Sequence, residues 1–130
     1  MSDWKGSGRA LVVDDDTLVR RTLERSLQLC GFEVSSAASG PEAIEIFAEA
    51  PQDFTVVLLD LTMPGMDGDE TLIELRKLRP DVVAVLVSGY DENEISRRFR
   101  TDMPHGLLKK PFRPRDLKEK LRQILDPESC

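Results

Sequence analysis

The stretch FTVVLLD, residues 54–60, is the part of the sequence that best indicates the fold. Five of its first six side chains are apolar, which is typical of a strand buried on both faces of a parallel sheet. The run ends on a carboxylate, Asp60. Parallel strands share one carboxyl edge, where open α/β sheets place their ligand sites. We therefore expect Asp60 at the functional edge of a central strand.

Three other apolar runs also end on polar side chains. They are residues 11–13 before Asp14-Asp15-Asp16, residues 82–87 before Ser88, and residues 106–108 before Lys109-Lys110-Pro111. If the strands are parallel, acids, a hydroxyl group and a lysine converge at one edge. That combination suits a phosphorylated carboxylate held by a divalent cation.

Stretches with helical spacing alternate with the apolar runs, which predicts an α/β fold with helices on both faces of the sheet. In the second helix we expect Ala43, Ile44, Phe47 and Ala48 to form the buried stripe. A capping box at Asp91 and Glu94 predicts the start of the fourth helix, with Ile95 and Phe99 as its apolar positions. The predicted strands are 11–13, 32–37, 54–59, 82–87 and 106–109. The first predicted helix carries Val19, Leu23, Leu27 and Cys30, and the others are 41–50, 69–78, from 91 onward and 114–125.

Composition restricts the class of protein. The chain has 130 residues, enough for one domain with its own core, and 40% of them are hydrophobic. The net charge of −6 argues against a nucleic-acid partner, which would be held mainly by Lys and Arg. No apolar stretch suggests a membrane span or a secretory signal, so we expect a cytoplasmic domain without membrane contact and with Cys30 and Cys130 as reduced thiols.

Clustered acids at a strand end repel one another unless a cation compensates. Mg²⁺ fits best, because it uses one or two carboxylates together with phosphate oxygens, whereas Ca²⁺ takes more ligands. No His or Cys cluster suggests zinc, and we expect no chemical role for His105, which lies in a predicted turn. Asp16 has two equal interpretations, as a third acid of the site or as the N-cap of the next helix.

Four ordered motifs carry a resemblance to the receiver domain of two-component response regulators. The resemblance implies a flavodoxin-like (βα)5 three-layer sandwich with a five-stranded parallel sheet of order 2-1-3-4-5. It also implies a flexible lead over residues 1–8, a receiver domain over 9–125 and a tail over 126–130. The motifs are ALVVDDD (10–16), VVLLDLTMPGMDG (56–68), VLVSGY (85–90) and LLKKPF (107–112).

The resemblance assigns the chemistry of the site. Asp60 is the phosphoacceptor, and Mg²⁺ is held by Asp15, Asp60 and the backbone carbonyl of Thr62, with Asp14 in the outer shell. Lys110 contacts the phosphoryl group, together with Ser88.

Further positions concern switching and lifetime. Ser88 matches the switch hydroxyl, but Leu107 stands where the family often has a switch aromatic residue. Thr62 and Tyr90 match positions that tune the lifetime of the phosphoryl group. A cis peptide is expected before Pro111.

The implied function is that of a phosphoacceptor in a phosphorelay, which takes a phosphoryl group from a phosphohistidine and signals by a conformational switch. The partner is a histidine kinase or a histidine phosphotransfer protein, and a dimer would form through helix four, strand five and helix five. Such a domain assists its own phosphorylation and dephosphorylation but is not an enzyme. Residues 4–8 and the motifs SGY and KKPFRP resemble the C-terminal receiver of hybrid sensor histidine kinases; a free-standing regulator is the alternative.

Three other interpretations agree less well with the sequence. A phosphatase of the haloacid dehalogenase type expects a second carboxylate two residues after the nucleophile, where this chain has Thr62. A receiver-like module that is never phosphorylated would not need the full set of acids, hydroxyl and lysine. A nucleotide-binding fold is disfavoured because Gly6-Ser7-Gly8 precedes the first strand. We interpret the arginine clusters, including Arg20-Arg21, as solvated helix faces or as part of a partner surface.

Overall fold

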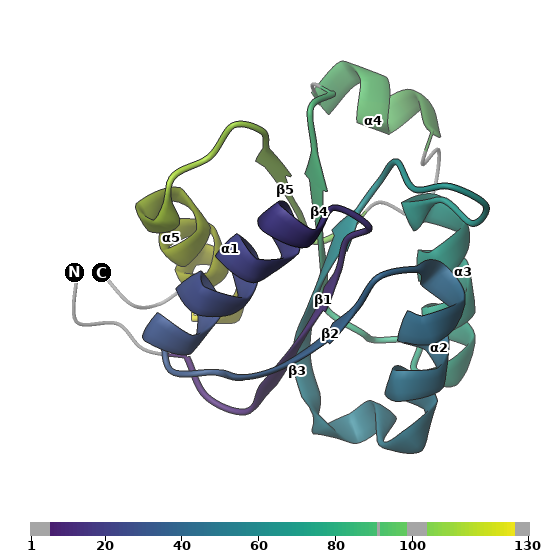
Figure 1. Cartoon of the computed structure of the whole chain (residues 1–130), viewed down its shortest axis with the longest axis horizontal. Coiled ribbons are helices and arrows are strands. Elements are labelled where there is room, and N and C mark those ends of the chain that lie inside the picture. Colours follow the sequence, from purple (N-terminus) through teal and green to yellow (C-terminus); the bar gives the residue numbers. More distant parts are fainter. Residues whose placement is uncertain (1–5, 91, 99–103, 127–130) are drawn as a thin grey trace.

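Five parallel strands form one sheet in the order β2-β1-β3-β4-β5 (Figure 1), which is the predicted flavodoxin-like order. The computed structural model describes residues 6–90, 92–98 and 104–126. The strands are β1 (Arg9–Val13), β2 (Glu33–Ala37), β3 (Phe54–Asp60), β4 (Ala84–Ser88) and β5 (Gly106–Lys109).

Helices cover both faces of the sheet and complete the three layers. Figure 1 shows α1 and α5 on one face and α2 and α3 on the other. Buried Ile95 places α4 with α2 and α3, because it joins the same core cluster. The helices are α1 (Thr17–Leu29), α2 (Gly40–Glu49), α3 (Gly68–Leu78), α4 (Glu92–Arg98) and α5 (Pro114–Leu125), and a short 3₁₀ helix, η1, spans Pro51–Asp53.

Strand β3 contributes to both halves of the core, which explains its continuous apolar run. Val57 and Leu59 pack into the cluster under α2, α3 and α4, whereas Val56 and Leu58 pack into the cluster under α1 and α5. Full burial of each such side chain contributes about 1.5–3 kcal/mol. These contacts fix the strand that carries Asp60.

Two predicted strands begin later than the sequence indicated, because their first backbone groups are used elsewhere. The amide of Phe32 donates to the carbonyl of Leu27 at the end of α1, so β2 begins at Glu33. The amide of Val82 donates to the carbonyl of Arg79 in a turn, and β4 begins at Ala84. At the other end, β3 extends by one residue and includes Asp60.

The buried stripe of α2 also differs from the prediction. Ala43 and Phe47 are buried, but Ala48 is exposed. Ile44 and Ile46 are half-buried and flank the stripe on either side. Ala48 lies one helical turn after Ile44 and points further from the buried side of α2, so it faces solvent. For the predicted start of α4, Asp91 and Phe99 lie outside the described residues.

The end of α1 and the residues before β1 are joined by backbone contacts. Gly31 has φ +107°, the left-handed conformation that glycine adopts most readily after a helix. Gly6 donates from its amide to the carbonyl of Cys30 at 2.7 Å, and Glu33 donates to the carbonyl of Gly8 at 2.9 Å. Residues 6–8, the last part of the predicted lead, are therefore hydrogen-bonded to the domain. Within the described residues, no helix combines the length and apolar character that crossing a bilayer requires.

Candidate functional site

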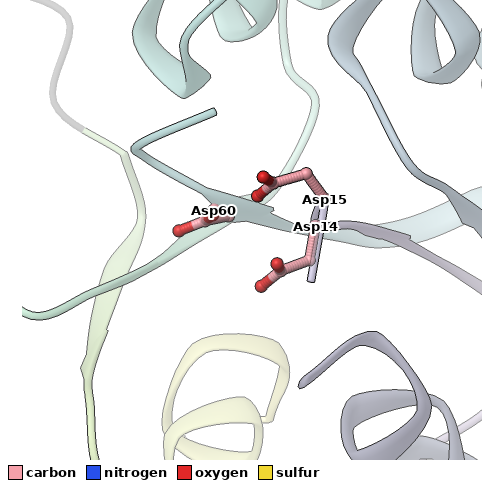
Figure 2. Close-up of side chains that lie close together, drawn as sticks. All are labelled: Asp14, Asp15 and Asp60. Atoms are coloured by element: carbon pink, nitrogen blue, oxygen red, sulfur yellow. The ribbon is translucent and has the colours of Figure 1, made fainter. Parts of the chain in front are cut away.

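Three carboxylates from two adjacent strands meet at the carboxyl edge of the sheet. Asp14 and Asp15 follow β1, and Asp60 ends β3, which pairs directly with β1. One oxygen of each carboxylate lies within 4.8 Å of the others. Figure 2 shows the three side chains gathered at this edge. The convergence predicted from the sequence is present.

Asp14 is fully buried, with 0% of its surface exposed. Its Oδ1 atom accepts a hydrogen bond from the amide of Asp16 at 2.8 Å. Its Oδ2 atom lies 3.8 Å from Nζ of Lys110 but accepts no hydrogen bond from the described residues. Burial raises the pKa of this carboxyl group. A buried carboxylate oxygen without a hydrogen bond is costly, and Mg²⁺ prefers oxygen ligands of this kind. The donor set therefore fits a magnesium ion.

Asp60 is 5% exposed. Its carboxyl group lies near the carboxylate of Asp14 and the ammonium group of Lys110. Burial, and then the negative charge of Asp14, raise the pKa of Asp60 to about 6, while the charge of Lys110 opposes that rise. The Nζ atom of Lys110 donates to Oδ1 of Asp60 at 3.3 Å. At neutral pH the carboxyl group is mostly ionised, as a nucleophile requires.

The backbone around β5 directs Lys110 toward the site. The amide of Lys110 donates to the carbonyl of Ser88 at 2.8 Å, which ties the residue to the end of β4. The peptide between Lys110 and Pro111 is cis, in agreement with the expectation from the resemblance. Lys109, one residue earlier, is exposed. Of the two adjacent lysines, Lys110 is the one that contacts the acids.

The residues predicted to act in switching and lifetime differ in their burial. Ser88 is buried at the end of β4, and its Oγ atom accepts a hydrogen bond from the amide of Tyr90 at 3.0 Å. The hydroxyl group is thus engaged with the loop that leads to α4. Tyr90 and Thr62 are exposed, and Leu107 is half-buried against the core beneath α2, α3 and α4.

Asp16 is the N-cap of α1, so the structure decides between its two interpretations. Its Oδ1 atom accepts hydrogen bonds from the amides of Leu18 at 2.9 Å and Val19 at 3.2 Å. These bonds satisfy amides that have no partner within the helix. The group of clustered carboxylates contains Asp14, Asp15 and Asp60 and not Asp16.

Arg20 contacts the backbone of the site, although we expected it on a solvated helix face or a partner surface. Its Nη1 atom donates to the backbone carbonyl of Asp14 at 2.7 Å. A signal for this contact exists in the sequence. If Asp16 is the N-cap, residue 20 lies in the first turns of the helix, and helical side chains lean toward the N-terminus, here toward the acidic loop.

Gly68 is a second residue that the sequence analysis did not single out. Its amide donates to the carbonyl of Leu61 at 2.7 Å, and a Cβ atom at this position would lie 2.4 Å from the carbonyl oxygen of Asp60. Only glycine lets α3 begin so close to the end of β3. The signal was the glycine placed where the predicted helix starts.

Two remaining predictions concern His105 and the two cysteines. The Nδ1 atom of His105 accepts a hydrogen bond from the amide of Ala84 at 3.3 Å, which is a structural contact at the start of β4. Cys30 is a buried free thiol, and Cys130 lies outside the described residues.

The fold and the site together define a flavodoxin-like domain with three clustered carboxylates and a lysine at the carboxyl edge of its sheet. The sequence profile of the response regulator receiver domain matches residues 10–122. The chain therefore belongs to the receiver-domain family of two-component systems, whose members are signalling domains.

Known proteins similar to this chain include a kinase and two receivers. Sensor kinase CckA of Brucella abortus (strain 2308) is 39% identical over 127 residues, which are 98% of this chain and 13% of that protein. The structure of chemotaxis protein CheY4 of Vibrio cholerae has a TM-score of 0.84 and 29% identity, covering 92% of this chain and 100% of that one. The receiver domain from the hybrid histidine kinase CckA has a TM-score of 0.77 and 32% identity, with coverage of 92% and 100%.

Proposed function

We propose that this domain accepts a phosphoryl group on Asp60. The observation that carries the proposal is the buried Asp60 carboxylate, which has Lys110 at 3.3 Å and the carboxylates of Asp14 and Asp15 within 4.8 Å. Membership of the receiver family supports the same role. The phosphatase alternative is not favoured, because the residue two positions after Asp60 is Thr62 rather than a carboxylate.

In the proposed reaction an oxygen of ionised Asp60 attacks the phosphorus of a phosphohistidine. The new O–P bond forms as the P–N bond breaks, and the imidazole leaves with the electron pair of that bond. Lys110 stays beside the acceptor and offsets charge on the phosphoryl oxygens. Asp15, Asp60 and the backbone carbonyl of Thr62 would hold a magnesium ion, with Asp14 in the outer shell, and the ion would supply further positive charge for these oxygens.

The signal arises when the hydroxyl group of Ser88 leaves the amide of Tyr90 and turns toward the phosphoryl group. The hydrogen bond that must break joins the amide of Tyr90 to Oγ of Ser88 and is 3.0 Å long. Half-buried Leu107 repacks in place of the usual aromatic residue, which changes the surface of α4, β5 and α5 and can bias dimer formation there. Thr62 and Tyr90, which are exposed to solvent, set how quickly water hydrolyses the acyl phosphate.

The phosphodonor is a histidine kinase or a histidine phosphotransfer protein in the cytoplasm. Similarity to sensor kinase CckA supports a parent protein of the hybrid-kinase class, of which this chain would be the receiver. The chain spans 13% of that kinase. The alternative is a free-standing regulator. The net charge of −6 supports a protein partner over a nucleic acid.

Acetyl phosphate with Mg²⁺ tests the proposal without a cognate kinase. Intact mass spectrometry should detect one added phosphoryl group on the wild-type protein, and removal of Mg²⁺ by a chelator should abolish it. Asp60→Asn, which keeps size and shape but removes the nucleophile, should stay unmodified. Equal modification of Asp60→Asn would refute Asp60 as acceptor.

A further inference from the structure

We propose that Arg20 is a positioning residue, which fixes the peptide between Asp14 and Asp15 and thereby sets the affinity of the acidic cluster for magnesium. The inference rests on the proposed function, because it assumes that Asp15 ligates this ion. It concerns a residue that contacts neither substrate nor metal and acts through the backbone of the two acids.

The contact is short and directed at one peptide group. The Nη1 atom of Arg20 donates to the carbonyl oxygen of Asp14 at 2.7 Å, and its Nη2 atom lies 3.5 Å from Oγ1 of Thr17. The carbonyl of Asp14 belongs to the same rigid plane as the amide of Asp15. Holding that oxygen therefore holds the orientation from which the side chain of Asp15 departs.

Asp15 depends on its backbone more than Asp14 does. The amide of Asp14 donates to the carbonyl of Ala37 at 3.1 Å, and its Oδ1 atom accepts from the amide of Asp16 at 2.8 Å. Asp14 is thus held through both its backbone amide and its side chain, independently of Arg20. Asp15 is exposed, so its surroundings restrain its side chain less. The peptide held by Arg20 is the structural link between the buried acid and the exposed one.

Loss of Arg20 has two opposing effects on magnesium affinity. Removal of a positive charge near the acids favours cation binding, and solvent and salt screen this effect only in part, because Arg20 is half-buried. Removal of a contact that orients metal ligands typically weakens metal binding by about 10- to 100-fold. We expect the orienting effect to win, so the affinity for magnesium should fall.

Arg21 provides a matched control for the charge effect. It follows Arg20 on α1, carries the same charge and is exposed. Arg20→Met and Arg21→Met each remove one positive charge from the same helical turn. Only Arg20→Met removes the hydrogen bond to the carbonyl of Asp14.

The test is an isothermal calorimetric titration of the unphosphorylated proteins with MgCl2, carried out well below their unfolding temperatures. Arg20→Met should have a dissociation constant at least about 10-fold higher than wild type, whereas Arg21→Met should stay within about two-fold. Equal constants for the two variants would overturn the inference, even if Arg20→Met lowers the unfolding temperature. Wild-type protein that binds no magnesium would instead contradict the proposed function.

A second pair of variants keeps the test valid if Arg20→Met does not fold. Arg20→Lys keeps the charge but loses the planar fork that reaches both the carbonyl of Asp14 and Thr17. Its dissociation constant for magnesium should be at least about three-fold higher than that of Arg21→Lys, which loses no such contact. No difference between these two lysine variants would likewise overturn the inference.

Discussion

The Nζ atom of Lys110 lies 3.3 Å from Oδ1 of Asp60, although 50 positions separate the two residues in the chain. The same nitrogen lies 3.8 Å from Oδ2 of Asp14. One lysine therefore offsets the charge of both buried acids in the unphosphorylated domain. Because it already stands beside the acceptor carboxylate, it needs little movement to reach the oxygens of a phosphoryl group on Asp60.

Lys110→Ala should accumulate far less phosphoprotein than wild type. Loss of the lysine removes a preorganised charge from the phosphoryl oxygens, an effect typically worth about 100-fold in rate. It also removes an influence that lowers the pKa of Asp60, so less of the nucleophile is ionised. The measurement is the rate of phosphorylation by acetyl phosphate, with exposed Lys109→Ala as the control. Equal rates for the two variants would contradict the role of Lys110.

Asp60→Asn should be more stable than wild type at neutral pH in the absence of metal. The pKa of Asp60 is raised from 3.8 to about 6, so above pH 6 the folded state bears the cost of ionising a buried carboxyl group. The asparagine variant avoids this cost, and we expect a gain on the order of 3 kcal/mol in the free energy of unfolding.

The pH dependence gives this prediction its sign. As the pH falls from about 6 toward 4, the folded wild type takes up a proton at Asp60 while the unfolded chain does not, so the stability difference between the two proteins shrinks. Urea denaturation of both proteins at several pH values measures this difference in stability. A constant difference across this range would show that ionisation of Asp60 is not its cause.

Mg²⁺ should raise the unfolding temperature of the wild-type protein, because an ion that binds only the folded state stabilises it. Asp15→Asn should lose this response. Asp16→Asn is the matched control, since it removes a neighbouring charge while asparagine caps a helix as well as aspartate does. Loss of the response in Asp16→Asn alone would place the ion elsewhere.

Gly68→Ala should destabilise the domain by roughly 1–3 kcal/mol, the usual cost of overpacking. The new Cβ atom would lie 2.4 Å from the carbonyl oxygen of Asp60, so the backbone must shift next to the phosphoacceptor. Gly89→Ala is the control, because nothing lies within 4 Å of a Cβ atom there. Chemical denaturation compares the two variants, and equal stabilities would argue against this close packing.

The sequence predicted the parts of the molecule that depend on burial. The apolar run of β3 and its terminal Asp60 were recognisable because a central strand is covered on both faces. The meeting of Asp14, Asp15 and Asp60 followed from the shared direction of parallel strands. Both inferences depend on patterns that can be read along the sequence, namely apolar runs and the polar residues that end them.

The sequence did not predict features that depend on local three-dimensional contacts. Strand starts at Glu33 and Ala84 are set by which carbonyl each preceding amide reaches. Exposure of Ala48 depends on how α2 is rotated against the sheet. The bond from Arg20 to the carbonyl of Asp14 depends on where α1 begins, which was open while Asp16 had two interpretations.

Chemical trapping of the acyl phosphate tests the central claim most directly. The protein is phosphorylated with acetyl phosphate and Mg²⁺ and then reduced with borohydride, which converts an aspartyl phosphate to homoserine. Peptide mass spectrometry should place homoserine at residue 60. Homoserine at another aspartate, or phosphate uptake with Asp60 unreduced, would contradict the account.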